Sequence, residues 1–284
     1  MHLTRSFQIG SVSVGGTGPL FLIAGPCVIE SEEHCRWVAG ELKSITSRCD
    51  VPFIFKASFD KANRTAASSF RGPGLEVGLE VLRSIRQELQ IPVLTDVHEV
   101  GQVERVAAAV DCLQIPAFLC RQTDLLMAAG RSGCAVNVKK GQFLSPWDME
   151  NIVKKLETFG CQRLLLTERG ASFGYNNLVV DMRAFPVLRQ WGWPVVYDVT
   201  HSLQLPGGQG SASGGQPQFI EYLARAGVAV GLDGLFLEVH ENPAMALSDG
   251  SNAMPLDRLE SLLHTVKQIH AVVADSTAVR PSNP

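Results

Sequence analysis

Residues 135–158, AVNVKKGQFLSPWDMENIVKKLET, contain one complete strand-and-helix unit of this chain. The short apolar run AVNV ends at Lys139, and from Ser145 onward the apolar residues are spaced as on one face of an amphipathic helix. A buried strand followed by such a helix is the repeating βα unit of parallel sheets. This stretch therefore predicts a parallel α/β fold.

The same unit recurs along the chain of 284 residues. Eight short apolar runs alternate with helical patterns, and most of the runs end at a residue that can bind an anion, a metal or a proton. In chain order these residues are Cys27, Lys56, Asp96, Gln114, Lys139, Arg169, His201 and Glu238. Eight βα units fit a closed (β/α)8 TIM barrel, whose active site is built at the carboxyl ends of its strands. We therefore expect these eight side chains to surround one site.

Two local patterns refine this fold. Residues 6–14, SFQIGSVSV, alternate apolar and polar side chains and predict a hairpin. We expect this hairpin to belong to an amino-terminal extension, residues 1–19, and to plug one end of a barrel domain that spans residues 20–284. The first barrel strand is expected at residues 21–29, followed by a helix capped by Ser31. After the sixth apolar run, RLLLTE, a helix is expected at residues 177–191.

Bulk composition limits the class of protein. Hydrophobic residues make up 45% of the chain, and the net charge of −3 argues against nucleic acid or an anionic membrane as the main partner. No window reaches the roughly 18 apolar residues of a membrane span, and the first residues lack a signal-peptide core, so we expect a cytoplasmic protein. The seven scattered cysteines do not suit a disulfide framework, and no nucleotide-binding glycine fingerprint or serine-hydrolase elbow is present.

Basic residues at strand ends predict an anion pocket. Lys56, Lys61, Lys139 and Arg169 follow three different strands, and a buried cation is costly unless an anion meets it. Strand alternation turns Lys139 into the barrel and Lys140 out of it. Together these cations suit a small, multiply charged anion such as a phosphorylated carboxylate. Pairing with protein carboxylates such as Glu168 is the alternative, and it accounts for one or two of the four.

Long loops after the strands predict a second anion-binding group. Residues 61–74, 206–216 and 240–254 all follow strands, on the face where a barrel carries its active site. Within the first loop lies the string Lys61-Ala62-Asn63-Arg64-Thr65, in which a guanidinium beside a hydroxyl suits a phosphate. Residues 206–216, PGGQGSASGGQ, have the composition of a lid that closes over substrate, and an idle loop is the alternative.

Four residues from the first, seventh and eighth strands and the loop beyond suit a metal ion. Cys27, His201, Glu238 and Asp249 offer one thiolate, one imidazole and two carboxylates, which fit a single divalent zinc, iron(II) or manganese ion better than magnesium. Each also has an ordinary structural interpretation, so spacing alone leaves both open. Of the other histidines, His98 and His240 lie just past strand ends, while His34 and two others are expected at helix surfaces.

Several strings together resemble one enzyme family. They are GPCVIES, FKASFDKANRT, FRGPGLE, TDVHE, QIPAFLCRQTDLL, NVKKGQFLSPWDM, TERGASFGYNNLVVDMR, YDVTHSLQLPGG and ALSDG. From about residue 20 to 270 the chain is similar to the 3-deoxy-D-manno-octulosonate 8-phosphate synthases, which condense phosphoenolpyruvate with arabinose 5-phosphate. The KANR string is the most telling, because the related synthase that uses erythrose 4-phosphate shows a KPRTS-like string there.

The resemblance implies roles for particular residues. Those that would hold phosphoenolpyruvate are Lys56, Lys61, Gln114, Ala117, Lys139 and Arg169, and those that would hold arabinose 5-phosphate are Asn63, Arg64, Thr65, Arg121, Gln204 and Ser213. His201, Asp96 and Lys61 are the implied catalytic residues, with the base left open between His201 and Asp96. Arg121 would reach in from a neighbouring subunit, which implies a homo-oligomer, by analogy a tetramer. Ala66 departs from the serine that is usual in the family and could weaken one sugar-phosphate contact.

The family also divides by metal dependence. Its metal-dependent members carry a cysteine in the first strand motif, whereas the metal-independent ones carry asparagine there and often a cysteine before the late aspartate. This chain has Cys27 and Ser248 at these positions, so the resemblance implies a metal-dependent enzyme.

Three other functions stay open at this stage. They are the related 3-deoxy-D-arabino-heptulosonate 7-phosphate synthase that uses erythrose 4-phosphate, a Schiff-base aldolase with a strand-end lysine as nucleophile, and a non-catalytic sugar-phosphate sensor.

Overall fold

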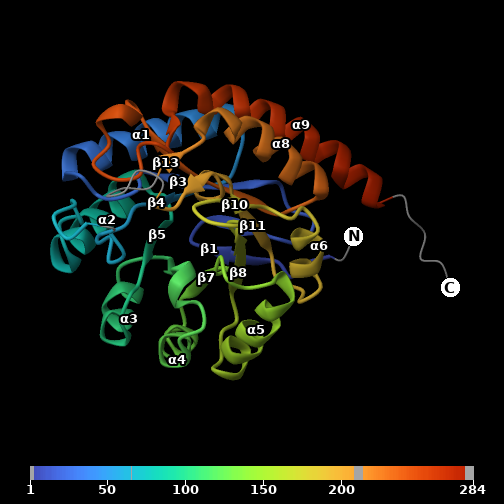
Figure 1. The fold of residues 1–284 in the computed structure, drawn as a ribbon, viewed down its shortest axis with the longest axis horizontal. Helices are drawn as coiled ribbons and strands as arrows, with labels where there is room; N and C mark the ends of the chain where they lie inside the picture. The colour runs from blue at the N-terminus through green and yellow to red at the C-terminus, as the bar shows by residue number, and fades with distance from the viewer. Residues whose placement is uncertain (1–2, 65, 208–213, 279–284) are drawn as a thin grey trace.

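Eight parallel strands close into a barrel in the computed structural model, which describes residues 3–64, 66–207 and 214–278 (Figure 1). Each strand pairs with the next along the chain, and the pairs β11 with β14 and β14 with β3 complete the circle. The barrel strands are β3 (Phe21–Gly25), β4 (Phe53–Lys56), β5 (Val93–Asp96), β6 (Cys112–Ile115), β7 (Ala135–Lys139), β8 (Leu164–Glu168), β11 (Val195–Asp198) and β14 (Gly234–His240). The predicted TIM barrel is confirmed.

Helices alternate with these strands and lie around the outside of the barrel (Figure 1). They are α1 (Glu32–Cys49), α2 (Leu75–Leu89), α3 (Val100–Ala107), α4 (Thr123–Arg131), α5 (Met149–Thr158), α6 (Ala184–Arg189), α8 (Ile220–Val230) and α9 (Leu259–Ala278), with one further turn, α7 (Val199–Ser202), directly after β11. Ser31 caps α1 by accepting a hydrogen bond of 3.1 Å from the His34 backbone amide, as the sequence predicted. None of the described helices combines the length and the apolar character that a membrane crossing requires.

Alternation along the strands divides the apolar residues into two layers. Val136 and Val138 point outward and join the large core between the sheet and the helices. Ile23, Ile54 and Leu94 point inward and form a smaller core that fills the amino-terminal end of the barrel. Because successive side chains of a strand face opposite ways, the polar residues on the inward face gather at the carboxyl end, above this inner core.

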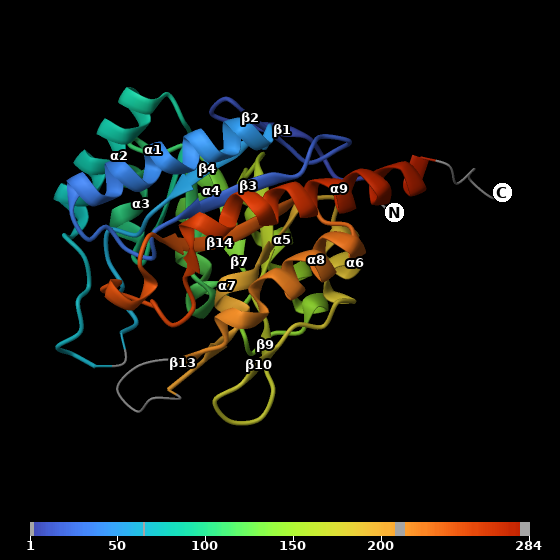
Figure 2. The ribbon, with the colours of Figure 1, turned by 90° about the horizontal axis from the view of Figure 1, so that it is seen from above.

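The amino-terminal hairpin closes the other end. Strands β1 (Phe7–Ile9) and β2 (Val12–Val14) pair antiparallel, and Ile9, Val12 and Val14 pack within the inner core. In Figure 2 the hairpin lies at the opposite end of the barrel from the loops that carry β10 (Leu178–Val179) and β13 (Gly214–Gly215). The predicted plug is therefore confirmed, and the open end is the carboxyl end.

Two sequence-based boundaries were wrong. The first strand ends at Gly25 instead of residue 29, because Pro26 has no amide hydrogen to donate to the sheet. Gly25 itself is required, since a Cβ there would lie 1.9 Å from the carbonyl oxygen of Lys56. The chain beyond keeps one isolated bridge between Val28 and Ser58.

The second wrong boundary concerns residues 177–191, of which only α6 is helical. Residues 171–179 form a small hairpin from β9 (Ala171–Ser172) and β10 (Leu178–Val179). Gly174 and Asn176, with φ of 77° and 53°, make its turn, and the β-branched pair Val179-Val180 favours extended backbone over helix. The hairpin lengthens the loop after β8 and adds it to the loops of the carboxyl end.

Candidate active site

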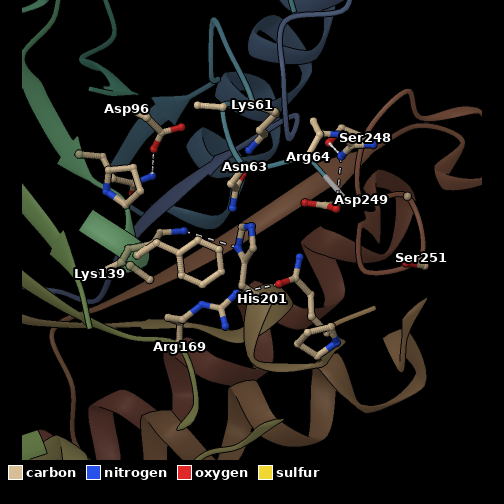
Figure 3. Close-up of a pocket in the computed structure, with 18 of the residues that line it drawn as sticks. Lys61, Asn63, Arg64, Asp96, Lys139, Arg169, His201, Ser248, Asp249 and Ser251 are labelled. Carbon is tan, nitrogen blue, oxygen red and sulfur yellow. Dashed lines mark hydrogen bonds and ion pairs between the residues drawn. The ribbon is translucent and has the colours of Figure 1, made fainter. Parts of the chain in front are cut away.

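One cavity of about 710 Å³ opens at the carboxyl end of the barrel (Figure 3). It lies where the loops after β4, β8, β11 and β14 meet. Among the side chains that line it are Lys56, Lys61, Asn63, Arg64, Asp96, Gln114, Ala117, Lys139, Arg169, His201, Gln204 and Asp249. These are twelve of the predicted site residues, drawn from regions of the chain that are distant in sequence.

Two lysines on β4 and the loop after it converge on Glu238. Lys56 is fully buried, and its ammonium donates to Glu238 Oε1 at 2.8 Å and to the Cys27 carbonyl at 2.9 Å. Lys61 Nζ lies 3.6 Å from the same Glu238 oxygen. Burial opposes the charge on Lys61, but the nearby carboxylates of Glu238, Asp96 and Asp249 outweigh burial and raise the pKa of Lys61. One carboxylate oxygen thus faces two cations, and the cluster remains electropositive.

Lys139 is held by Asp198 at the centre of the cavity. Its ammonium donates to Asp198 Oδ2 and lies 3.6 Å from the centroid of the Phe236 ring. Burial lowers the pKa of Lys139, and Asp198 opposes that shift. Lys140, which strand alternation predicted to point outward, lies outside the cavity and donates to the carbonyls of Gly141 and Leu144. The predicted choice between the two lysines is confirmed.

Arg169 carries the least compensated charge of the group. Its Nη2 donates to Gln204 Oε1 at 2.7 Å, while its buried Nη1 has no hydrogen-bond partner within the described part of the chain. Burial lowers the pKa of Arg169, with only partial relief from Asp198 and Glu168. A buried guanidinium nitrogen without an acceptor is costly in free energy, and an anionic ligand would remove that cost.

A chain of buried polar side chains spans half of the barrel wall. Thr167 Oγ1 donates to Asn137 Oδ1 at 2.6 Å, and Asn137 Nδ2 donates to Gln114 Oε1 at 2.9 Å. Gln114 Nε2 then donates to Asp96 Oδ1, and Ser58 donates to the other oxygen of Asp96. These hydrogen bonds fix the orientation of the Gln114 side-chain amide, and both oxygens of Asp96 act as acceptors.

The environment of Asp96 keeps it ionised. Burial opposes ionisation, but Lys56 and Lys61, together with the Ser58 hydroxyl, outweigh it and hold the pKa of Asp96 well below its usual range. A carboxylate with such a low pKa accepts a proton poorly near neutral pH. Its geometry suits holding Gln114 and the two lysines in place.

The residues expected to hold a sugar phosphate lie at the mouth of the cavity. Arg64 Nη1 donates to Ser248 Oγ at 2.7 Å and lies 3.8 Å from Asp249 Oδ1, so loop 61–74 contacts loop 240–254. Asn63 points into the cavity beside Lys61 (Figure 3). Thr65 and Ser213 lie outside the described residues, as does most of the expected lid. Arg121 is exposed and does not line this cavity, so its expected service to a neighbouring subunit stays a prediction.

Three of the four residues expected to bind a metal form one cluster at the edge of the cavity, and the fourth, His201, lies next to one of them. Cys27 Sγ, a Glu238 oxygen and an Asp249 oxygen lie within 4.8 Å of one another, and His201 Nε2 lies 3.4 Å from Glu238 Oε1. Asp249 has a φ of 50°, a left-handed conformation that residues other than glycine rarely adopt. This conformation accompanies the approach of its carboxylate to Cys27, at 3.4 Å.

Two observations fit this cluster to a borderline divalent ion. Glu238 Oε2 is buried and has no hydrogen-bond partner among the described residues. The donor set is one sulfur, one imidazole nitrogen and two carboxylates, which suits zinc, iron(II) or manganese. Burial, followed by the nearby carboxylates of Asp249 and Glu238, raises the pKa of the Cys27 thiol, and a bound cation would favour the thiolate instead.

Asp198 and Ser248 are site residues that the sequence analysis did not assign to the site. Asp198 Oδ2 lies 2.8 Å from His201 Nδ1, an arrangement that puts the proton on Nδ1 and leaves the Nε2 lone pair facing Glu238. Ser248 Oγ lies 3.0 Å from Cys27 Sγ and so links it to Arg64. The signal for Asp198 was available, because it ends an apolar strand three residues before His201.

Comparison with known proteins gives a consistent result. A model of the DAHP synthetase I family matches residues 4–275. Proteins named 2-dehydro-3-deoxyphosphooctonate aldolase from Geobacter metallireducens, Trichlorobacter lovleyi and Geotalea daltonii are 59%, 58% and 56% identical over 271 residues, which is 95% of this chain and 100% of each relative. The chain belongs to the 2-dehydro-3-deoxyphosphooctonate aldolase family. This is another name for the 3-deoxy-D-manno-octulosonate 8-phosphate synthases, so the family suggested by the sequence motifs is confirmed.

Membership in this family accounts for the cations at the deep end of the cavity and for Arg64 at its mouth. The deep group around Lys139 and Arg169 and the outer group at Asn63 and Arg64 share one cavity, as an enzyme that joins two anionic molecules requires. The family relation does not test the metal ligands, and they stay a prediction that the geometry of the cluster supports.

Proposed function

We propose that this protein condenses phosphoenolpyruvate with D-arabinose 5-phosphate and water to form 3-deoxy-D-manno-octulosonate 8-phosphate and phosphate, a transferase reaction of lipopolysaccharide biosynthesis. The observation that carries the proposal is a single cavity of about 710 Å³ with two separate cationic groups, in a chain 59% identical to a named 2-dehydro-3-deoxyphosphooctonate aldolase. The relatives' name also favours this reaction over the related condensation with erythrose 4-phosphate.

The deep end of the cavity suits phosphoenolpyruvate. Its carboxylate and phosphate would be met by Lys56, Lys61, Lys139 and Arg169, with Gln114 and Ala117 at the wall. The unpartnered Nη1 of Arg169 is the donor best placed to gain an acceptor. Because this donor and its neighbours are buried and already oriented, their attraction for an anion is weakly screened by water.

The mouth of the cavity suits the pentose phosphate. Asn63 and Arg64 would bind its phosphate, with Gln204 approaching from the loop after β11 and with Thr65, Ser213 and a neighbouring subunit's Arg121 expected to contribute. This arrangement places the aldehyde toward the deep end and the phosphate toward solvent. Lys61 lies between the two groups and remains protonated, so it can hydrogen-bond the aldehyde oxygen as that oxygen gains negative charge.

The bond changes define what the residues must do. The methylene carbon of phosphoenolpyruvate forms a bond to the aldehyde carbon, water adds to the carbon that bears the phosphate, and the resulting hemiketal loses phosphate. Lys139 and Arg169 would stabilise the departing phosphate charge by preorganised donors. Asp96 would keep Gln114 oriented, and its low pKa makes it a poor acceptor for the proton of the water.

A divalent ion held by Cys27, His201, Glu238 and Asp249 is part of the proposal. When bound, such an ion would polarise oxygen atoms of the substrate aldehyde or of water as a Lewis acid. Within the chain, Asp198 would hold the imidazole of His201 in the tautomer that such binding needs.

We also propose a cytoplasmic homo-oligomer, a tetramer by analogy. Seven cysteines without a disulfide in the described residues fit a reducing compartment. The exposed position of Arg121, outside its own cavity, is what a residue serving a neighbouring site would show.

The deciding experiment measures phosphate release from phosphoenolpyruvate with arabinose 5-phosphate or erythrose 4-phosphate, with and without a chelator. We expect release with arabinose 5-phosphate only, lost on chelation and restored by a divalent ion. Preference for erythrose 4-phosphate would overturn the substrate assignment, and full activity after complete removal of metal would overturn the metal assignment alone.

A further inference from the structure

A second cluster of metal-ligating side chains lies beside the start of α1 and the end of β14. It consists of Glu30, His34 and His240, each of which offers one ligand atom, and these atoms lie within 4.8 Å of one another. The centroids of the two imidazole rings lie 4.9 Å apart, and the ring planes are tilted by 36°. The cluster shares no residue with Cys27, His201, Glu238 and Asp249. His34, expected at the surface of its helix, is instead half-buried here.

Two nitrogen atoms in this cluster have no hydrogen-bond partner within the described part of the chain. They are His34 Nδ1 and His240 Nε2, and both are buried. His240 is only 4% exposed, and its Nε2 lies 3.5 Å from Glu30 Oε1, beyond good hydrogen-bonding distance. Buried polar atoms are normally satisfied, so two orphaned imidazole nitrogens in one cluster require an explanation.

Glu241 lies on the other side of both rings. Its Oε2 is 2.9 Å from His34 Nε2 and 3.3 Å from His240 Nδ1. A carboxylate that accepts a hydrogen bond from one imidazole nitrogen leaves the lone pair of the opposite nitrogen free, as in the outer shell of many metal-binding histidines. Glu241 therefore leaves the lone pair of His34 Nδ1 free, while His240 Nδ1 accepts from the Asn242 amide and His240 Nε2 faces Glu30.

We propose that Glu30, His34 and His240 bind a second divalent cation of the zinc type, oriented by Glu241. Two imidazoles and a carboxylate are ligands for zinc, cobalt(II), nickel(II) or iron(II) and are poor ligands for magnesium. The Glu30 and His34 side chains are each 16% exposed, so the ion can enter from solvent and water can complete its coordination. Binding requires the proton of His240 to lie on Nδ1, so the Asn242 amide, now 3.0 Å from that nitrogen, must turn away.

The second ion would stabilise the loop that completes the active site. Glu30 Oε1 also accepts a hydrogen bond of 2.9 Å from the Leu247 backbone amide. An ion at Glu30 and His240 would therefore join the start of α1 to both parts of loop 240–254, which carries Ser248 and Asp249. The site would be structural, because it lies outside the cavity where the substrates are proposed to bind.

The test counts Co²⁺ ions bound per chain to metal-free protein, by equilibrium dialysis and optical absorption. The variants are His34→Gln and Glu241→Gln, with His264→Gln as a matched control. His264 belongs to a third cluster, Cys49, Glu260 and His264, in which both Glu260 oxygens already bind Arg48. Circular dichroism of each variant checks that it is folded.

The proposal expects His34→Gln to bind one equivalent fewer than the unmodified protein, while His264→Gln binds the same number. Glu241→Gln should weaken the affinity for this second ion about 10- to 100-fold. The thiolate-to-cobalt charge-transfer band, which an ion at Cys27 would give and an ion at Glu30, His34 and His240 would not, should persist in His34→Gln. The second site is overturned if His34→Gln binds as many Co²⁺ ions as the unmodified protein. It is also overturned if the ion that His34→Gln loses is the one that gives the charge-transfer band.

Discussion

Replacing Asp198 with asparagine should weaken both the fold and the proposed divalent-ion site. Asp198 is fully buried, and its Oδ2 accepts from the ammonium of Lys139 and lies 2.8 Å from His201 Nδ1. Its Oδ1 accepts from the His201 backbone amide at 2.9 Å and from Thr200 at 3.2 Å. Asparagine keeps the shape and one acceptor oxygen, but it places an NH₂ group near donors and leaves Lys139 without its anion.

The magnitude follows from these contacts. Removal of one partner of a buried ion pair costs about 3–5 kcal/mol of unfolding free energy. Burial already lowers the pKa of Lys139, so that lysine can lose its proton, and we expect a value near the lower end, about 3 kcal/mol. Loss of the carboxylate behind a metal-binding histidine should also weaken ion binding about 10- to 100-fold.

The assay pairs urea unfolding with ion affinity measured against a competing chelator. Asp233→Asn is the matched control, because Asp233 is also buried and accepts a hydrogen bond of 2.7 Å from Arg189, but it lies just before β14, at the amino-terminal end of the barrel. The control should lose stability and keep its affinity for the ion. If Asp198→Asn bound the ion as tightly as the unmodified protein, the role given to Asp198 in orienting His201 would be wrong.

Four further predictions concern the same cavity. Arg169→Ala should raise the KM for phosphoenolpyruvate by about 10- to 100-fold, because a charged hydrogen bond is worth about 1.5–3 kcal/mol. Cys27→Ala should reduce ion affinity and phosphate release together, and added divalent ion should restore part of the release. Borohydride with both substrates should trap no covalent adduct, because the buried lysines pair with carboxylates and serve as cations. The pKa of Asp96 is lower in the folded than in the unfolded protein, so ionised Asp96 stabilises the fold above its unfolded pKa. This stabilisation is lost as the pH falls. The unfolding free energy of Asp96→Asn should therefore depend less on pH between about pH 5 and pH 2.

Each of these has a contrary result. A normal KM in Arg169→Ala would exclude its guanidinium as a phosphoenolpyruvate ligand. Unchanged ion content in Cys27→Ala would remove that thiol from the metal site, and a trapped adduct on a lysine would restore the Schiff-base aldolase. An acid unfolding curve of Asp96→Asn parallel to that of the unmodified protein would mean that Asp96 has an ordinary pKa.

Much of the site could be predicted because it lies at the ends of regular elements. Lys56, Asp96 and Lys139 each end a strand and Arg169 directly follows one, and parallel strands in a barrel bring their carboxyl ends to one rim. Strand alternation was enough to separate Lys139 from Lys140. The hairpin plug was predictable for the same reason, since alternating apolar residues need a surface to cover.

Loops were harder, because their conformation depends on contacts that have no period in the sequence. The segment before α6 contains enough apolar residues to suggest a helix, but the turn at Gly174 and Asn176 makes a hairpin there. The contact between the rings of His34 and His240 was also missed, because it depends on how the loop after β14 passes the start of α1.

The amino-acid sequence by itself determined the barrel, the order of its elements and the types of side chain at its rim, since apolar periodicity dictates which faces are buried. Only the tertiary structure decided which rim residues touch. Cys27 and Ser248 are 221 positions apart and 3.0 Å apart in space, and Asp198 has both Lys139 and His201 as partners. Such contacts form only when the eighth strand closes on the first and the loops settle over the rim, and no local pattern encodes that distance.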